Sequence, residues 1–309
     1  MSASRTDAVA INGVTKTFGA FTAVNDLTLH VPAGSVYGFI GPNGSGKTTT
    51  LRMIMRIFHP DRGTIRVLGE DATAGAAACD RIGYLPEERG LYRKMKVIDV
   101  LEFYAALKGA RGMRGEIATW LKRLELPGVE NKKVEALSKG MAQKVQFIAT
   151  VLHKPELVIL DEPFSGLDPV NMDVLKDAVL DLKRAGATVL FSTHDMDVAE
   201  RMCDFVFMIF KGQKVLDGTL EQIKSQYGAD TLRVRLGGNG VAFDRLPGVE
   251  RVNDFGQFQE LRVRSGADPQ AVLRALVDHG RVEHFEIARP SLHDIFVRIA
   301  RPSPEEVAP

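Results

Sequence analysis

The residues with the clearest chemistry form one glycine-rich turn. It consists of Gly41, Pro42, Asn43, Gly44, Ser45, Gly46, Lys47, Thr48 and Thr49. The turn follows an apolar segment, 35–40, and leads straight into a segment that reads as a helix. Glycines let backbone N–H groups converge on phosphate oxygens, and a helix N-terminus adds partial positive charge. Lys47 can reach the outer phosphates and the Thr48 hydroxyl can hold Mg²⁺, so the turn predicts a phosphate-binding loop.

Two carboxylates end a second apolar segment further along the chain. Asp161 and Glu162 follow the residues Leu-Val-Ile-Leu at 157–160. The carboxyl ends of parallel strands are where ligands bind, and strand alternation points the two side chains in different directions. Asp161 is the candidate Mg²⁺ ligand, and Glu162 is the candidate general base for an attacking water. An isolated Asp-Glu pair would be read as a turn, but together with the Lys47 loop it predicts catalysis.

Strands and helices alternate around these motifs. Strands are predicted at 8–14, 27–31, 35–40, 64–68, 82–85, 157–160, 188–192 and 205–209. Helices are predicted at 140–153, 170–185 and 196–203. A helical period without strands runs from Val97 to about Leu126 and reads as an insertion. The fold class is therefore α/β, with a mainly parallel sheet flanked by helices.

The length of the chain suggests a second domain. At 309 residues it is long for a single core. We expect one domain over residues 1–228, with its helical subdomain at about 86–135, and a small α+β domain over residues 229–300. Residues 301–309 are rich in Pro and Glu and are expected to be disordered.

The bulk composition is that of an ordinary globular protein. Hydrophobic residues make up 45% and charged residues 26%, and the formal net charge of +1 indicates no global field for nucleic acid. The two cysteines, Cys79 and Cys203, have no paired spacing and are expected to be core residues in a reducing cytoplasm. The start of the chain lacks a signal-peptide layout, and no apolar run is long enough to cross a bilayer. A membrane role would need another polypeptide.

Taken in order, the motifs resemble those of ATP-binding-cassette ATPases over roughly residues 8–225. Phe18 matches the aromatic residue on which adenine stacks, and Ser138 and Gly140 lie in a segment, Leu-Ser-Lys-Gly-Met, that matches the family signature. The segment Ser-Gly-Leu-Asp at 165–168 looks like the loop between two ATP sites, and His194 matches the histidine that contacts the γ-phosphate. Taken singly, Phe18 and His194 would be read as core residues.

The resemblance implies a fold, a site and partners. The fold is the P-loop cassette core with an added antiparallel β subdomain. Lys47, Glu162 and His194 are the implied catalytic residues, with ATP and Mg²⁺ as cofactors. Ser138 and Gly140 of one chain are implied to cover the ATP of another, which predicts a homodimer or a heterodimer with a related chain. The insertion is where the family docks onto a separate transmembrane permease, so the chain is expected on the inner face of the cell membrane.

Two positions depart from the common family pattern. Glu87 stands where a glutamine is usual, and Lys139 stands where the signature commonly has glycine. Both variants look like a branch of bacterial export ATPases with a C-terminal extension. Glu87 is a candidate Mg²⁺ ligand or a sensor of the partner, and its charge changes the electrostatics beside the metal.

The sequence is compatible with two functions from different classes. The first is the ATP-hydrolysing motor of an exporter. The second is a soluble cassette ATPase acting on nucleic acid or ribosomes, which the near-zero net charge, the single cassette and the lack of long heptad repeats disfavour. The C-terminal domain is expected to supply core or dimer contacts, with ligand sensing as the alternative. The transported substance is not encoded in these motifs.

Overall fold

The computed structural model describes residues 7–72, 80–88, 90–227, 231–237, 243–264, 266–288 and 290–300. The chain forms two compact units that divide between Thr219 and Leu220. This division precedes the boundary predicted after residue 228, because helix α7 (Leu220–Gln226) groups with the second unit. The tail at 301–309 and Cys79 lie outside the described residues.

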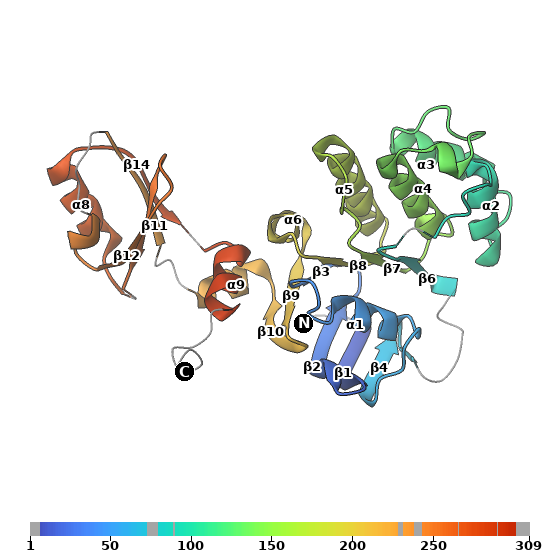
Figure 1. Cartoon of the computed structure of the whole chain (residues 1–309), viewed down its shortest axis with the longest axis horizontal. Coiled ribbons are helices and arrows are strands. Elements are labelled where there is room, and N and C mark those ends of the chain that lie inside the picture. The colour runs from blue at the N-terminus through green and yellow to red at the C-terminus, as the bar shows by residue number, and fades with distance from the viewer. Residues whose placement is uncertain are drawn as a thin grey trace, which may run out of the picture. The chain divides into compact units, whose positions relative to one another are not determined.

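A six-stranded sheet is the centre of the first unit (Figure 1). Its order is β10-β9-β3-β8-β7-β6. The strands are β3 (Val36–Ile40), β6 (Ile82–Leu85), β7 (Leu157–Asp161), β8 (Thr188–Thr193), β9 (Phe205–Phe210) and β10 (Gln213–Gly218). The five strands from β9 to β6 pair in parallel, and β10 adds to the edge in the antiparallel direction. The predicted parallel sheet is confirmed.

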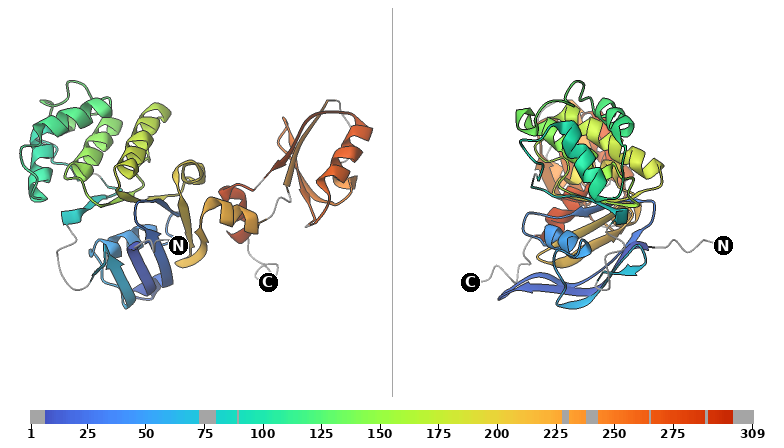
Figure 2. Two further views of the ribbon diagram at one scale, coloured as in Figure 1. Left: turned by 180° about the vertical axis from the view of Figure 1, so that it is seen from behind. Right: turned by 90° about the vertical axis from the view of Figure 1, so that its right-hand side faces the viewer.

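Apolar residues on both sides of its strands bury this sheet on two faces. On β7, Val158 and Leu160 pack into one hydrophobic cluster, and Leu157 and Ile159 pack into another. The helices on the first face are α2 (Val97–Leu107), α3 (Arg114–Arg123), α4 (Lys139–Val151) and α5 (Pro169–Arg184), and α2 and α3 pack against α4 as the predicted insertion (Figure 2). Such continuous burial explains why the strands read as unbroken apolar runs.

The opposite face is covered by helix α1 (Lys47–Ile54) and by a second, antiparallel sheet (Figure 1). That sheet has the order β2-β1-β4-β5. Its strands are β1 (Asp7–Phe18), β2 (Phe21–Pro32), β4 (Arg62–Val67) and β5 (Glu70–Asp71). Helix α6 (Met196–Met202) follows β8 and packs near Cys203, whose thiol pKa is raised by burial. Cys203 is half-buried and packs against the hydrophobic cluster that contains Val198 and Met202.

The second unit contains a four-stranded antiparallel sheet in the order β12-β13-β11-β14. Its elements after α7 are β11 (Thr231–Gly237), β12 (Val249–Asp254), β13 (Gln259–Val263), α8 (Pro269–His279), β14 (Arg281–Ala288) and α9 (Leu292–Ala300). Leu232 and Val234 of β11 bury their side chains with Val272 and Leu276 of α8. One face of the sheet thus packs against a helix, which gives an α+β arrangement. None of the helices in the described ranges is long and apolar enough to span a membrane.

Candidate active site

The glycine-rich turn connects β3 to α1, at the carboxyl edge of the parallel sheet. Gly46 caps the helix with φ 108°, and a Cβ on it would lie 2.5 Å from the carbonyl oxygen of Ala23. A Cβ on Gly41 would lie 2.3 Å from the carbonyl oxygen of Ile209. Only glycine fits either position, so the loop backbone is held tightly against its neighbours. The first turn of α1 holds no acidic residue, which leaves its positive end available to an anion.

Lys47 is buried inside this loop. Its side chain is 6% exposed, and Nζ donates hydrogen bonds to the carbonyl oxygens of Gly41 at 2.7 Å and Pro42 at 3.3 Å. The same nitrogen lies 3.5 Å from Oε1 of Glu162. The ammonium group is therefore held between the loop and the end of β7, where an outer phosphate would reach both.

Ser192 on β8 links the two carboxylates at the end of β7. Asp161 is fully buried, and its Oδ1 accepts a hydrogen bond from Ser192 Oγ at 2.5 Å. The same hydroxyl accepts a hydrogen bond from the backbone N–H of Glu162 at 3.0 Å. Sequence reasoning gave Ser192 no role, because its placement depends on the parallel register that sets Asp161 opposite Ser192.

Glu162 lies between two other candidate catalytic residues, Lys47 and His194. Its Oε2 is 3.0 Å from Nδ1 of His194, and its Oε1 faces Lys47. The backbone of Glu162 has φ 49°, in the left-handed region, and the side chain is 9% exposed. Backbone strain of this kind at a non-glycine residue concentrates at functional sites. The arrangement holds a carboxylate where it could orient a water beside the loop.

Three buried oxygens at this edge have no hydrogen-bond partner. They are Oγ of Ser45, Oδ2 of Asp161 and Oε1 of Glu162. An unsatisfied buried polar atom is costly, and hard oxygen donors are what Mg²⁺ prefers. No group of three His, Cys, Asp or Glu side chains that could hold a metal occurs among the described residues. The residues present fit an Mg²⁺ ion held by Asp161, Thr48, nucleotide phosphates and water.

A pocket of about 360 Å³ joins most of the predicted residues. Its lining consists of Phe21, Ala23, Asn43, Gly44, Ser45, Gly46, Lys47, Thr48, Thr49, Glu87 and Glu162. Phe18 is not part of this lining, because its ring packs edge-on against Phe58 with centroids 5.4 Å apart. Phe21, which is 62% exposed, lines the pocket instead. Sequence reasoning missed Phe21, although both aromatics flank the same turn between β1 and β2.

The signature residues lie at a different surface of the chain. Ser138 caps α4 by accepting a hydrogen bond from the Met141 N–H at 3.2 Å. Gly140 has an ordinary backbone conformation, and a Cβ on it would meet Leu167 Cδ2 only at 3.5 Å. Neither residue lines the pocket around Lys47. One chain therefore brings together the loop, both carboxylates, His194 and Glu87, but not Ser138 or Gly140.

Comparison with known proteins identifies both parts of the chain. The ABC transporter family matches residues 24–165, and the C-terminal domain of DrrA1-3-like ATP-binding proteins matches residues 218–300. The uncharacterized ABC transporter ATP-binding protein YhaQ of Bacillus subtilis is 43% identical, over 94% of this chain and 97% of its own. The daunorubicin resistance ATP-binding protein DrrA3 of Streptomyces coeruleorubidus is 32% identical, over 94% and 95% of the two chains.

A solved ATP-binding subunit of an ABC transporter has the same fold. It superposes with a TM-score of 0.67 at 31% identity, covering 72% of this chain and 93% of that one. These matches confirm the predicted cassette fold and the ATPase activity, and they do not support a cassette ATPase that acts on nucleic acid or ribosomes. The chain belongs to the ATP-binding subunits of ABC transporters, which hydrolyse ATP and work with a transmembrane partner.

Proposed function

We propose that two ATPase chains close around two Mg²⁺-ATP molecules and that this closure drives a permease. The separation of Lys47 from Ser138 and Gly140 within one chain carries the proposal. A side chain at Gly140 would meet only ordinary contacts inside the chain, so its own fold does not require glycine there. Close approach of a nucleotide held by another chain would require it.

The phosphate-binding loop and the residues at the ends of β7 and β8 would have different roles in ATP hydrolysis. Lys47 and the N-terminus of α1 would hold the phosphates, and Thr48 and Asp161 would hold Mg²⁺, which supplies charge stabilisation when bound. Glu162 would orient the attacking water, and His194 would contact the γ-phosphate and keep Glu162 in place through the 3.0 Å contact. Ser192 would fix both carboxylates.

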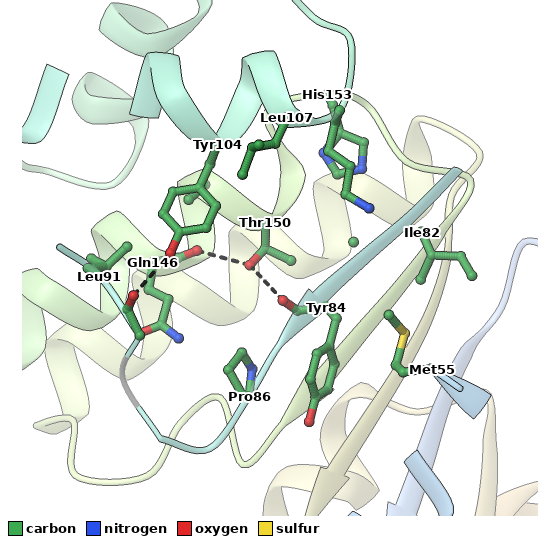
Figure 3. A pocket seen from close by; sticks show the side chains of 14 residues that line it. Met55, Ile82, Tyr84, Pro86, Leu91, Tyr104, Leu107, Gln146, Thr150 and His153 are labelled. Atoms are coloured by element: carbon green, nitrogen blue, oxygen red, sulfur yellow. Dashed lines mark hydrogen bonds between the residues drawn. The ribbon is translucent and has the colours of Figure 1, made fainter. Parts of the chain in front are cut away.

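The permease would dock at a pocket between β6, α2 and α4 (Figure 3). The pocket has a volume of about 290 Å³, and Leu91, Tyr104, Leu107 and Met55 contribute apolar surface to it. Leu107 is 61% exposed, which is unusual for a large apolar side chain beside a cavity. An apolar side chain from a cytoplasmic helix of the permease would fill the pocket and cover Leu107.

We further propose the direction of transport and the place of the protein. Its relatives include chains named for daunorubicin resistance and for Nod factor export. With the C-terminal match to the DrrA-like domain, this favours an exporter whose ATPase lies on the cytoplasmic side of the cell membrane. Residues 229–300 would then form an accessory domain of the ATPase. Its apolar residues form a core around α8, which favours a structural or dimer role over ligand sensing.

Replacement of Glu162 by Gln tests the ATPase cycle. We expect hydrolysis to fall roughly 10²–10⁴-fold, the usual contribution of a general base, and ATP to trap a dimer. Size-exclusion chromatography with light scattering and a phosphate-release assay measure the two effects. Glu250→Gln, at an exposed residue of β12, is the control for the change in charge. Normal turnover in the Glu162 variant, or a monomer with bound Mg²⁺-ATP, would refute the proposed cycle.

Replacement of Leu107 by Glu tests the docking pocket. A carboxylate at the pocket edge should abolish co-purification with the permease while leaving ATP binding intact. Val277 on α8 is 60% exposed, nearly the same as Leu107, so Val277→Glu is a matched control. Retention of the permease by Leu107→Glu would place the docking surface elsewhere.

A further inference from the structure

Lys139 is a cation at an electrostatically unfavourable place. It is the first residue of α4, its side chain is exposed, and the first turn of the helix has no acidic residue to balance it. The N-terminus of a helix already carries partial positive charge, so an added ammonium group is disfavoured there. Lys139 forms no ion pair within the part of the chain that the structure describes. A local conflict of this kind is expected where a side chain serves something outside the fold.

The surroundings of Lys139 keep it accessible to an anion. Its Nζ lies 2.8 Å from the place that a Cβ on Gly166 would take, so the absence of a side chain at Gly166 makes room for it. Lys139 also lines a hollow of about 500 Å³ together with Ser138, Arg93 and Glu135. Glu135 is the one acid in that lining, and it lies 3.9 Å from Lys133. Hydroxyl, ammonium and guanidinium groups thus converge beside the signature.

Glu87 is an anion at an electrostatically unfavourable place, in the nucleotide pocket around Lys47. It lines the nucleotide pocket together with Lys47, Thr48 and Glu162, and its side chain is exposed. It has no ion pair among the described residues. A second carboxylate beside Glu162 repels the phosphates that this pocket would hold, because like charges at close range disfavour one another. Among the residues that the structure describes, Lys47 is the cation in this lining, and it is paired with Glu162, so no ion pair offsets the charge of Glu87.

We propose that Glu87 and the partner subunit's Lys139 act on the same triphosphate as a compensating charge pair. This inference rests on the proposed dimer and requires a second copy of this chain as the partner. The signature of one copy would cover the loop of the other, so the ammonium of Lys139 would reach the phosphates and offset the carboxylate of Glu87. The two unusual residues are then one feature, and ATP-driven closure depends on Lys139 because Glu87 is acidic.

A double-mutant cycle tests this pairing. In chains that carry Glu162→Gln, the dimer dissociation constant is measured by sedimentation in saturating Mg²⁺-ATP for the parent, Glu87→Gln, Lys139→Met and the double variant. We expect Lys139→Met to weaken the dimer roughly tenfold or more, as loss of a charged hydrogen bond does at each of two sites. In the Glu87→Gln background the same change should cost several-fold less, since contacting residues couple. Lys122→Met, at an exposed residue of α3, controls for net charge.

The outcomes separate this inference from the proposed dimer. Equal effects of Lys139→Met in both backgrounds, or no effect, would overturn the charge pair. A lower melting temperature of the Lys139→Met monomer with an unchanged dimer would also overturn it, because Lys139 would then act only on its own chain near Gly166. Failure of the Glu162→Gln parent to dimerise with Mg²⁺-ATP would instead refute the proposed cycle. Lys139→Arg should keep the parent affinity.

Discussion

Ser192→Ala removes the hydroxyl that joins the two carboxylates of the active site. Ser192 is fully buried, donates to Asp161 Oδ1 and accepts from the Glu162 N–H. A hydrogen bond to a charged group contributes about 1.5–3 kcal/mol and a neutral one about 0.5–1.5 kcal/mol. The change should therefore lower the free energy of unfolding by about 2–4.5 kcal/mol. Urea denaturation without nucleotide measures this loss.

The same change should disturb metal use. Asp161 would lose the group that orients Oδ1, and Glu162 would lose a support for its left-handed backbone. Partners of this kind typically affect metal affinity or activity 10–100-fold, so the Mg²⁺ concentration for half-maximal ATPase activity should rise by roughly that factor. Titration of Mg²⁺ at fixed ATP measures the shift.

Ser35→Ala is the matched control for Ser192→Ala. Ser35 is 4% exposed and donates one hydrogen bond to the Pro32 carbonyl oxygen at 2.6 Å, away from the active site. Its loss should cost about 1 kcal/mol and leave the Mg²⁺ requirement unchanged. If the two alanine variants lose equal stability and share one Mg²⁺ requirement, Ser192 does not position the carboxylates.

Three further predictions concern the loop, the adenine and the docking pocket. Gly46→Ala should abolish ATP binding because its Cβ would meet a backbone oxygen at 2.5 Å. Gly44→Ala has open space around its Cβ and should cost only about 1 kcal/mol of stability. ATP titration and calorimetry measure the two effects. Phe21→Ala should weaken ATP binding by roughly 1–3 kcal/mol if adenine stacks on Phe21. Phe18→Ala tests the alternative predicted from sequence, and an unchanged affinity in either variant would show that adenine does not stack on that ring. Burial, and then the charge of Lys108, lower the pKa of His153 below 6.5. The folded state therefore binds the proton less readily than the unfolded state does, and the protein should lose stability as the pH falls below 6.5. Urea melts above and below pH 6.5 should show this loss in the parent but not in His153→Leu.

The loop and the core strands could be predicted because their signals are local. Gly41 and Gly46 occupy positions where any Cβ would strike a backbone oxygen, and such demands are visible in sequence as glycine. The strand β7 has residues buried on both faces, so it reads as an apolar run with a clear end at Asp161. Where the fold requires one residue type at a position, that residue can be recognised in the sequence and the local structure can be predicted from it.

The elements that were missed lack such requirements. The edge strand β10 has one buried residue, Leu216, and helix α7 has one, Ile223. A single buried side chain leaves no period to read. Strand β12 was also missed: it has no buried residue and pairs on only one side, with β13, so its sequence shows no buried face.

The missed site residues depend on contacts between distant segments. The role of Ser192 follows from the register of β7 against β8, and the role of Phe21 follows from how the turn between β1 and β2 meets the loop. Neither can be derived from spacing along the chain. The signals that could have found them are a serine opposite the catalytic pair and a second aromatic three residues after Phe18.

The segment after β6 explains how one chain could couple ATP to a permease. Glu87 lines the nucleotide pocket, whereas Pro86 and Leu91 line the docking pocket, so this one short segment borders both pockets. Strand β6 anchors this segment to β7 beside Asp161. A shift of Glu87 on closure would therefore move the floor of the docking pocket, because the backbone between Pro86 and Glu87 cannot stretch. The negative charge of Glu87 beside the phosphates would then make the position of this segment depend on whether a triphosphate is bound. With a neutral side chain at position 87 this dependence would be weaker.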